Sequence, residues 1–329
     1  MTDPFDIVTC YTPGEISRYP APLLGDFDPV VIERHQPDCH LMVQLPDGAL
    51  TARASLWWKS SPPLDDHKIG CIGHFAATEI VSAQGVLNAA CRRLSDQGCT
   101  LAVGPIDGST WRRYRFLTSR GEEPRFLMEP DNPDEWPMYW TKTGFEVLAS
   151  YFSALNKNLA FEDPKVMRAG DRLAEQGIQL RNLDLENYHR DLRAIYDLSL
   201  DAFVGNLLYT PLPEIEFFGE YETIQSRIRP ELVLLAEMDN QLVGYLFAIP
   251  DWLRGPQTDT VIVKTVAILP HRKVSGLGAW LVANAQIAAR DLGYTRVIHA
   301  LMHENNVSRR LSARYATPFR SYTVFKKQL

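Results

Sequence analysis

The segment that most constrains the fold of this chain spans residues 266–281 and reads VAILPHRKVSGLGAWL. A short apolar run ends at Pro270, a basic loop follows, and Gly276 and Gly278 then open an amphipathic stretch. Glycines at the start of a helix let a ligand approach backbone N–H groups that have no partner within the helix, and the helix dipole places positive charge there. The segment therefore predicts a strand, a loop and a helix that together form a cradle for a pyrophosphate.

The stretch after the glycines has the periodicity of a helix with one apolar face. The apolar residues at steps of three and four are Leu277, Leu281, Ala285, Ala288 and Leu292. Gly293 stands where a helix C-terminus favours a residue without a Cβ.

Two other phosphate-binding motifs do not fit this segment. A dinucleotide-binding loop needs a third glycine, where this chain has Leu281, and an acidic residue at the end of the next strand. A Walker loop needs Gly-Lys followed by Ser or Thr, which is absent here.

The order of strand, proline, basic residue and Gly-x-Gly resembles the acyl-CoA-binding motif of the GNAT N-acetyltransferase superfamily. That family usually has Arg or Gln at the third position after the proline, where this chain has Lys273, which keeps the charge without the planar guanidinium. The resemblance implies acetyl-CoA or CoA as co-substrate, with an Asn before the last helix in contact with its arm; Asn306 or Asn305 fits that position. The cofactor-binding residues predicted on this basis are Val266, Ile268, Lys273, Val274, Ser275, Gly276, Leu277, Gly278, Ala279 and Asn306.

An internal repeat indicates that the chain contains two copies of one unit. Asp-x-Gly-x-Thr occurs at residues 96–100 and again at 291–295, in both cases between a helix-like and a strand-like stretch. Hairpin signals precede both copies, and aromatic strand-like segments follow them. The predicted fold class is α/β (α+β), with two tandem GNAT-like domains, each a mixed, mostly antiparallel sheet flanked by helices.

The predicted domains are residues 1–158, a polar connector at 159–176 with a short helix, and residues 177–329. Sliding one copy on the other places Val81 and Ala83 at the positions of the two glycines. Side chains there would block the pyrophosphate. The first domain is therefore predicted to have lost the cradle and to act as a structural half or to help shape the acceptor site.

The catalytic residues are less well defined than the cradle. Many family members have a Tyr seven residues after the Asn that protonates the departing thiolate; Ser312 takes that place after Asn305, and Tyr315 lies one turn further on. We therefore expect Tyr315 to be the acid, if a dedicated acid exists.

The general base is left open between several residues. His299, in a strand, titrates closest to neutral pH unless it is an ordinary core residue. Glu237 lies in the hairpin of the second copy, and His303 and Glu304 lie near the mouth.

The region most informative about the acceptor is residues 203–222, where aromatic residues alternate with Glu214, Glu216, Glu220 and Glu222. By resemblance it should wall the acceptor pocket and suit a cationic or partly apolar amine, although a solvated amphipathic helix would have the same composition.

Lys264 and residues 111–115 each allow two interpretations, one structural and one functional. Lys264 is unusual in an apolar strand and should pair with a carboxylate or lie near the acceptor. Residues 111–115 form a basic-aromatic cluster, expected as a surface strand or an anion-recognising lid.

The composition excludes several classes of protein. Of 329 residues, 45% are hydrophobic and 22% charged, and the net charge of −6 argues against a nucleic-acid or anionic-membrane partner. The N-terminus has no basic region followed by an apolar run, so no signal peptide is expected. Five cysteines without a Cys-x-x-Cys pair suit the cytoplasm. His35, Cys39 and His40 have no fourth ligand spaced near them, so no metal site is predicted.

The sequence therefore predicts a cytoplasmic CoA-dependent N-acetyltransferase that is a monomer or homodimer. It would move an acetyl or other short acyl group to an amine of a small molecule by direct attack, because the second domain has no cysteine to carry the acyl group. The alternatives are a nonenzymatic acyl-CoA sensor and an aminoacyl-tRNA-dependent transferase, which would need a basic surface for RNA.

Overall fold

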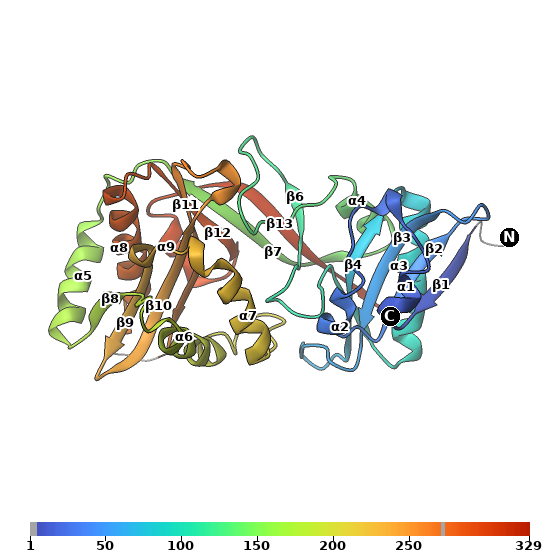
Figure 1. The fold of residues 1–329 in the computed structure, drawn as a ribbon, viewed down its shortest axis with the longest axis horizontal. Helices are drawn as coiled ribbons and strands as arrows, with labels where there is room; N and C mark the ends of the chain where they lie inside the picture. Colours follow the sequence, from blue (N-terminus) through green and yellow to red (C-terminus); the bar gives the residue numbers. More distant parts are fainter. Residues whose placement is uncertain (1–4, 271–273) are drawn as a thin grey trace.

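A computed structural model describes residues 5–270 and 274–329 of the chain, which form two lobes (Figure 1). The elements of the first lobe and the strand that follows are β1 (Asp6–Cys10), α1 (Pro13–Ile16), α2 (Val31–His35), β2 (Cys39–Gln44), β3 (Leu50–Trp57), β4 (Ile69–Ala77), α3 (Ile80–Asp96), β5 (Leu101–Gly104), β6 (Phe116–Ser119), α4 (Trp136–Lys142) and β7 (Glu146–Asn156). Those of the second are α5 (Pro164–Glu175), β8 (Gln179–Asn182), α6 (Tyr188–Ala202), α7 (Glu214–Ile224), β9 (Val233–Met238), β10 (Gln241–Pro250), β11 (Thr260–Ile268), α8 (Leu277–Asp291), β12 (Arg296–His303), α9 (Val307–Ser312) and β13 (Thr317–Gln328).

One continuous sheet runs through both lobes. Its strand order is β1-β2-β3-β4-β5-β13-β7-β12-β11-β10-β9-β8. β6 is not part of this order and pairs with β13 as an additional strand. Only β4–β5 and β11–β12 are parallel pairs among the described strands. The mixed, mostly antiparallel sheet flanked by helices confirms the predicted fold class.

The closing strands of the two halves are exchanged. β7, which ends the first half, pairs with β12 of the second, from Val297 opposite Asn156 to His303 opposite Tyr151. β13, which ends the second half, pairs with β5 of the first, with Phe325 opposite Gly104. The two exchanged strands also pair with each other and cross the middle of the molecule (Figure 1).

Apolar side chains fill both faces of the sheet. In the first lobe α3 covers one face with Ala83, Val86, Leu87, Ala90 and Leu94. On the opposite face, apolar residues of the first lobe pack with residues of β7 and β13 and with Leu208 of the second half. This hydrophobic core is therefore shared between the two halves. In the second lobe α6 and α7 cover one face of the sheet and α8 covers the other.

The helix predicted after the glycines is α8, and its buried face differs in part from the prediction. Leu277, Leu281 and Ala285 are buried as expected, but Leu292 caps the helix and is 43% exposed. Ala289 continues the buried face instead. The buried face of α8 therefore includes Leu277, Leu281, Ala285 and Ala289, which are four residues apart.

The segment 159–176, predicted as a polar connector, contains a helix that is part of the second lobe. This helix, α5, packs along α8, where Val166 meets Ala279 and Ala283. A Cβ on Gly170 would lie 2.2 Å from the indole nitrogen of Trp280, so a glycine is required for this close packing. None of the helices in the described ranges combines the length and the apolar character that a membrane crossing requires.

Candidate functional site

The two central strands of the second lobe separate part-way along their length. β11 and β12 pair in parallel from Thr260 opposite Arg296 only as far as Val263 opposite His299. β11 continues to Ile268 with β10 alone as its neighbour. Within the described residues, the edge of 264–268 that faces β12 has no strand beside it, and such an edge can pair with an extended ligand.

The N-terminus of α8 lies beyond the end of this open edge. Gly276 caps the helix with φ +96°, a left-handed conformation that favours glycine. An added Cβ there would stand 3.6 Å from Ala169 and 4.0 Å from a guanidinium nitrogen of Arg172 on α5. The sequence did not single out Arg172, which places a second positive charge beside the helix terminus.

The structure brings several of the predicted cofactor-binding residues together. A Cβ on Gly278 would lie 2.9 Å from Ile268 and 3.9 Å from Val266, so this glycine lets α8 approach the open strand. Val274 is buried and Ser275 is exposed beside Gly276. Leu277 and Ala279 are buried in the first turn of α8. Lys273, with His271 and Arg272, lies outside the described residues.

Asn306 takes the position of helix cap. It precedes α9, and its side-chain oxygen accepts a hydrogen bond from the backbone N–H of Ser308 at 3.4 Å. Leu311 of the same helix approaches Gly278, so α9 borders the first turn of α8.

Lys264 lies where the strands begin to separate. The β10–β11 register shifts there, because Phe247 pairs with Thr265 and the next residue, Ala248, pairs with Val263. Lys264 is thus the extra residue of a β-bulge, a feature that re-aims a side chain. Its ammonium lies 5.9 Å from the centre of the Tyr221 ring.

Glu220 of α7 is the carboxylate that faces Lys264. Desolvation raises the pKa of Glu220, which the Lys264 ammonium opposes, and desolvation lowers the pKa of Lys264, which Glu220 opposes. Glu220 nevertheless keeps solvent-accessible surface. A ligand can therefore reach Glu220 from solvent.

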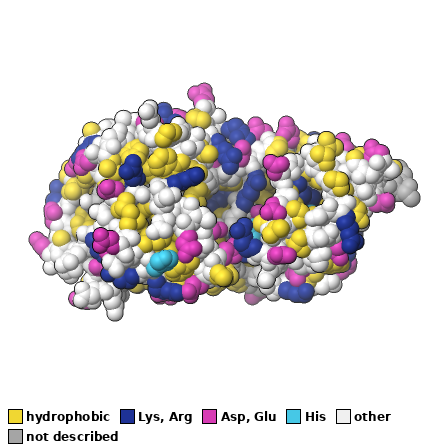
Figure 2. Space-filling view, in the orientation of Figure 1, with side chains coloured by type: hydrophobic (Ala, Val, Ile, Leu, Met, Phe, Trp, Pro, Cys, Tyr) yellow, Lys and Arg dark blue, Asp and Glu magenta, His cyan; other side chains and the backbone are white. Residues whose placement is uncertain are grey.

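The region predicted to wall the acceptor pocket lies between the two halves. Trp111 of the first half donates its indole N–H to the carbonyl of Thr210 at 3.1 Å and packs edge-on against Phe203 and Phe217. The segment 111–115 is therefore a docking loop, and the expectation of a surface strand is wrong, because these side chains find partners in the other half. Figure 2 shows Lys and Arg side chains where the surface is hollowed between the lobes.

Two other glutamates of this wall, Glu214 and Glu216, are engaged in ion pairs. Glu216 is buried and accepts two hydrogen bonds of 2.8 Å from the guanidinium of Arg112. Glu214 pairs with Arg193 on the surface. Glu220 and Glu222 have no ion pair of this kind within the described ranges, and of these two Glu220 is the one that faces Lys264.

His299 lies at the point where β11 and β12 separate. Its Nδ1 is 2.8 Å from the hydroxyl of Ser312, the residue at the position of the family's Tyr. Its Nε2 is buried and has no partner among the described residues. Burial lowers the pKa of His299 to about 4, so the ring is neutral at pH 7 and a weak proton acceptor.

Tyr315 lies on the α8 side of the sheet. Its ring packs 6.0 Å from that of Phe161, and its hydroxyl is buried without a partner in the parts of the chain that the structure describes. Burial raises the pKa of Tyr315, which keeps it protonated at neutral pH and able to donate.

The other base candidates have partners elsewhere. His303 accepts a hydrogen bond from the backbone N–H of Asn305, and Glu304 lines an open depression of about 400 Å³ together with residues of β6, β7 and β13. Glu237 accepts a hydrogen bond of 2.8 Å from Arg181, which also holds the buried Asp191. Glu237 lies in β9, two strands from the open edge of β11.

Replacing Glu237 by Gln should separate structure from catalysis. Loss of the pair with Arg181 should cost about 1 kcal/mol of the free energy of unfolding, because the Glu237 side chain is 30% exposed. Turnover per folded molecule should stay the same. Thermal unfolding and initial rates measured on one preparation check both; a turnover loss of about a hundredfold or more would restore Glu237 as the base.

The connection between strand and helix that corresponds to the cradle is much shorter in the first lobe. β4 ends at Ala77 and α3 begins at Ile80, so two residues connect them. The corresponding connection in the second lobe runs from 269 to 276. Val81 and Ala83 both lie within α3. The short connection leaves no loop to surround a pyrophosphate.

The histidines near the start of the chain are separated by the fold. Cys39 and His40 are buried in β2, where His40 Nδ1 lies 2.8 Å from the hydroxyl of Ser55. His35 instead meets His74 and Asp107, neither of which is near it in sequence.

Comparison with known proteins finds one family that matches part of the chain and solved structures that share its fold. Residues 192–315 match the family model described as Acetyltransferase (GNAT) family. A solved GCN5-related N-acetyltransferase from Sphaerobacter thermophilus shares the fold over the whole chain and 96% of its own length, with 15% identity and a TM-score of 0.51. A tandem GNAT protein from the clavulanic acid biosynthesis pathway shares it over 98% of both chains, with 12% identity and a TM-score of 0.51. Residues 192–315 thus match the GNAT family, and the fold of the whole chain is similar to the folds of these two solved proteins.

One curated relative extends the comparison. The bacterial ceramide synthase of Caulobacter vibrioides is 23% identical over 184 residues, which are 54% of this chain and 48% of that protein. The chain thus matches about half the length of this relative.

Proposed function

We propose that the second half of this chain binds acyl-CoA and transfers its acyl group to an amine of a small molecule. One observation carries the proposal: the unpaired edge of β11 at 264–268 leads to the glycine-capped N-terminus of α8. The extended pantetheine arm of CoA can pair with the edge of β11, and its pyrophosphate can bind at the N-terminus of α8. The residues that would hold it are those predicted above, with Arg172 added. The GNAT fold generally binds acetyl-CoA, and an acetyl group is the proposed cargo.

The acceptor would enter between α7 and the open edge of β11. An alkyl amine with a pKa near 10.4 is neutral in only about one molecule in 2,500 at pH 7, so a proton acceptor near the cleft aids attack. Glu220 is accessible, faces Lys264 and has a raised pKa, which brings it nearer to neutral pH. The aromatic residues of the wall suit an amine with an apolar portion.

The reaction would proceed by direct attack. The amine nitrogen forms a bond to the thioester carbonyl carbon and gives a proton to Glu220, and the carbon–sulfur bond breaks with its electron pair leaving on sulfur. The thiolate takes a proton from Tyr315 or from water. The proposal needs no nucleic acid or membrane, and a monomer or homodimer suffices.

A change of Gly276 to Val should abolish CoA binding. Val is strained at φ +96° and adds bulk beside Ala169 and Arg172, where the pyrophosphate would lie. Isothermal calorimetry should give one CoA site per wild-type chain and no measurable site in the variant. Gly293→Val is the matched control, because Gly293 has φ +91° with open space around it and lies at the other end of α8.

Two results would contradict the cofactor assignment: two equivalent CoA sites per chain, or equal CoA affinity in the Gly276 and Gly293 variants. The alternative of a nonenzymatic sensor predicts the same binding without release of CoA thiol when a panel of amines is added, so a thiol assay separates it from a transferase.

A further inference from the structure

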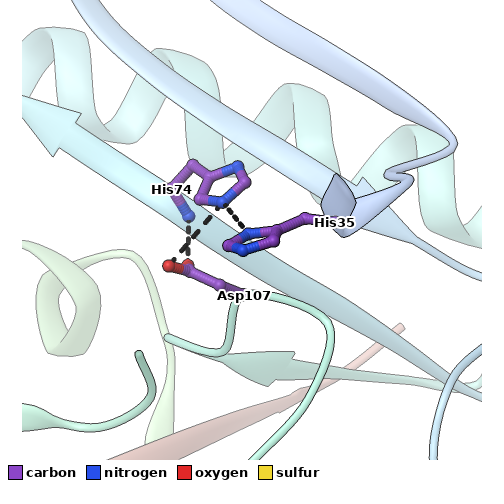
Figure 3. A group of neighbouring side chains, drawn as sticks. All are labelled: His35, His74 and Asp107. Atoms are coloured by element: carbon purple, nitrogen blue, oxygen red, sulfur yellow. Dashed lines mark hydrogen bonds and ion pairs between the residues drawn. The ribbon is translucent and has the colours of Figure 1, made fainter. Parts of the chain in front are cut away.

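A second polar cluster lies in the first lobe, away from the proposed acyl-CoA site. His35 ends α2, His74 lies in β4 and Asp107 follows β5, and their side chains converge (Figure 3). One ligand atom from each lies within 4.8 Å of the other two. His35 Nδ1 and His74 Nε2 are 2.9 Å apart, and a carboxylate oxygen of Asp107 is 3.7 Å from His74 Nε2.

The backbone is specially shaped to bring these groups together. His74 has φ +45°, a left-handed conformation that is uncommon for residues other than glycine, although Asn, Asp and His adopt it more often than most. Its neighbour Gly73 approaches the loop after β5 so closely that a Cβ would lie 2.2 Å from the carbonyl oxygen of Ile106. The backbone N–H of His74 donates to Asp107 at 2.6 Å. Backbone strain of this kind is held in place by its surroundings and is common at functional sites.

Further contacts orient the imidazole of His74 and hold the backbone of His35. The second ring nitrogen of His74, Nδ1, lies 2.9 Å from the hydroxyl of Ser55. The indole of Trp57 and the guanidinium of Arg112 both donate to the carbonyl of His35, at 2.8 and 3.1 Å. Metal-binding histidines are characteristically oriented by a hydrogen bond at their other nitrogen.

We propose that His35, His74 and Asp107 form a zinc site. Two imidazole nitrogens and one carboxylate oxygen are a ligand set that zinc uses with water in the fourth position. Zinc–nitrogen bonds of about 2.0–2.1 Å in tetrahedral geometry set the two nitrogens about 3.3 Å apart, so the rings need to separate by about 0.4 Å. The ion would replace the proton that the two nitrogens now share.

The charges around the cluster favour neutral imidazoles and limit the affinity for a cation. Burial lowers the pKa of His35 to about 4 and that of His74 to about 3, so both rings are unprotonated, as metal ligands must be. The guanidiniums of Arg53, Arg112 and Arg113 act in the same direction on His74. They also repel zinc, although Arg112 is paired with Glu216. The site should therefore bind zinc less tightly than sites without nearby arginines.

The location gives the ion a bracing role. It would tie α2 and β4 to the loop after β5, and this loop carries Trp111 and Arg112 into contact with the second half. The first lobe would then hold one wall of the acceptor cleft through a metal-fixed loop, without cofactor chemistry of its own.

Metal binding by the full-length chain tests this assignment. After treatment with chelator and removal of the chelator, equilibrium dialysis against zinc chloride should give one ion per chain by elemental analysis, and cobalt should give the visible absorption of a tetrahedral site. His74→Asn and Asp107→Asn should weaken zinc binding at least tenfold to hundredfold. Asn tolerates the left-handed backbone at position 74. His67→Gln is the control, because His67 bonds Thr100 away from the cluster.

The result that would overturn the proposal is a folded wild-type chain that takes up no zinc in excess zinc chloride, or zinc uptake that persists in both cluster variants. Circular dichroism and thermal unfolding of the metal-free proteins establish that each variant is folded. Ser55→Ala leaves all three ligands in place and should weaken zinc about tenfold through loss of the bond to His74. If Ser55→Ala binds zinc with unchanged affinity, and His74→Asn and Asp107→Asn still take up zinc, the ion binds elsewhere on the protein.

Discussion

Residues 177–329 expressed alone should not form a stable monomer, although they contain the whole matched family segment. In the intact chain β12 is paired on one side by β7, which such a fragment lacks, and β13 would lose both β7 and β5. Two long strand edges with buried residues such as Tyr322 and Val324 would be exposed to solvent. Exposed apolar edges favour association. Size-exclusion chromatography and thermal unfolding should show aggregates or oligomers without a cooperative monomeric transition.

The fragment 146–329 restores β7 beside β12 and β13 together with α5, and the fragment 159–329, which has α5 without β7, is the matched comparison for the strand. The fragment 146–329 should regain a cooperative transition, although β13 still lacks β5. A monomeric 177–329 fragment that unfolds cooperatively near the temperature of the full chain would show that the exchanged strands are dispensable, and that the halves fold independently.

The sequence predicted local features of the fold well. The cradle helix, the glycine at its end and the two closing strands were each readable from periodicity and turn residues. Asp239 and Asn240 both have positive φ, as the hairpin signal requires. These features depend on neighbours a few residues apart, and such interactions are recorded directly in a short stretch of sequence.

Partner choice over long distances was not readable in the same way. Both closing strands, β7 and β13, are aromatic and apolar. Nothing in the alternation of their residues shows whether each pairs with β5 of the first half or with β12 of the second. The short helix predicted in the polar connector is α5. That its Arg172 borders the cradle was not readable, because this position depends on how α5 packs against Trp280. His35, His74 and Asp107 meet through three separate segments, so no spacing rule could find them.

The proposed site shows the same division between local and distant information. The glycine cap was predicted from contiguous residues, and the contacts of Val266 and Ile268 were expected from the family resemblance. The proximity of Glu220 to Lys264 instead joins α7 to a bulge in β11. Lys264 was noticeable only as an ammonium in an apolar strand. A charged residue that breaks a local pattern is thus a useful sign of a site even when its partner is unknown.

Glu220→Gln should lower kcat/KM for the amine about a hundredfold to ten-thousandfold at neutral pH, the range expected for loss of a general base. CoA affinity should remain at its wild-type value, because Glu220 lies on α7 and the cradle on α8. In the wild type the rate should rise with pH as Glu220 loses its proton. Because desolvation raises its pKa above 4.5, this acidic limb should lie above that value, and it should disappear in the variant.

Glu222→Gln is the control for the loss of one charge from the same helix. Residues two positions apart in a helix point in nearly opposite directions, so Glu222 cannot share the cleft with Glu220. The defect of Glu220→Gln should shrink as the pH approaches the pKa of the amine, since the acceptor is then already neutral and needs no base. A defect that is constant with pH, or equal in the two variants, would remove Glu220 from proton transfer.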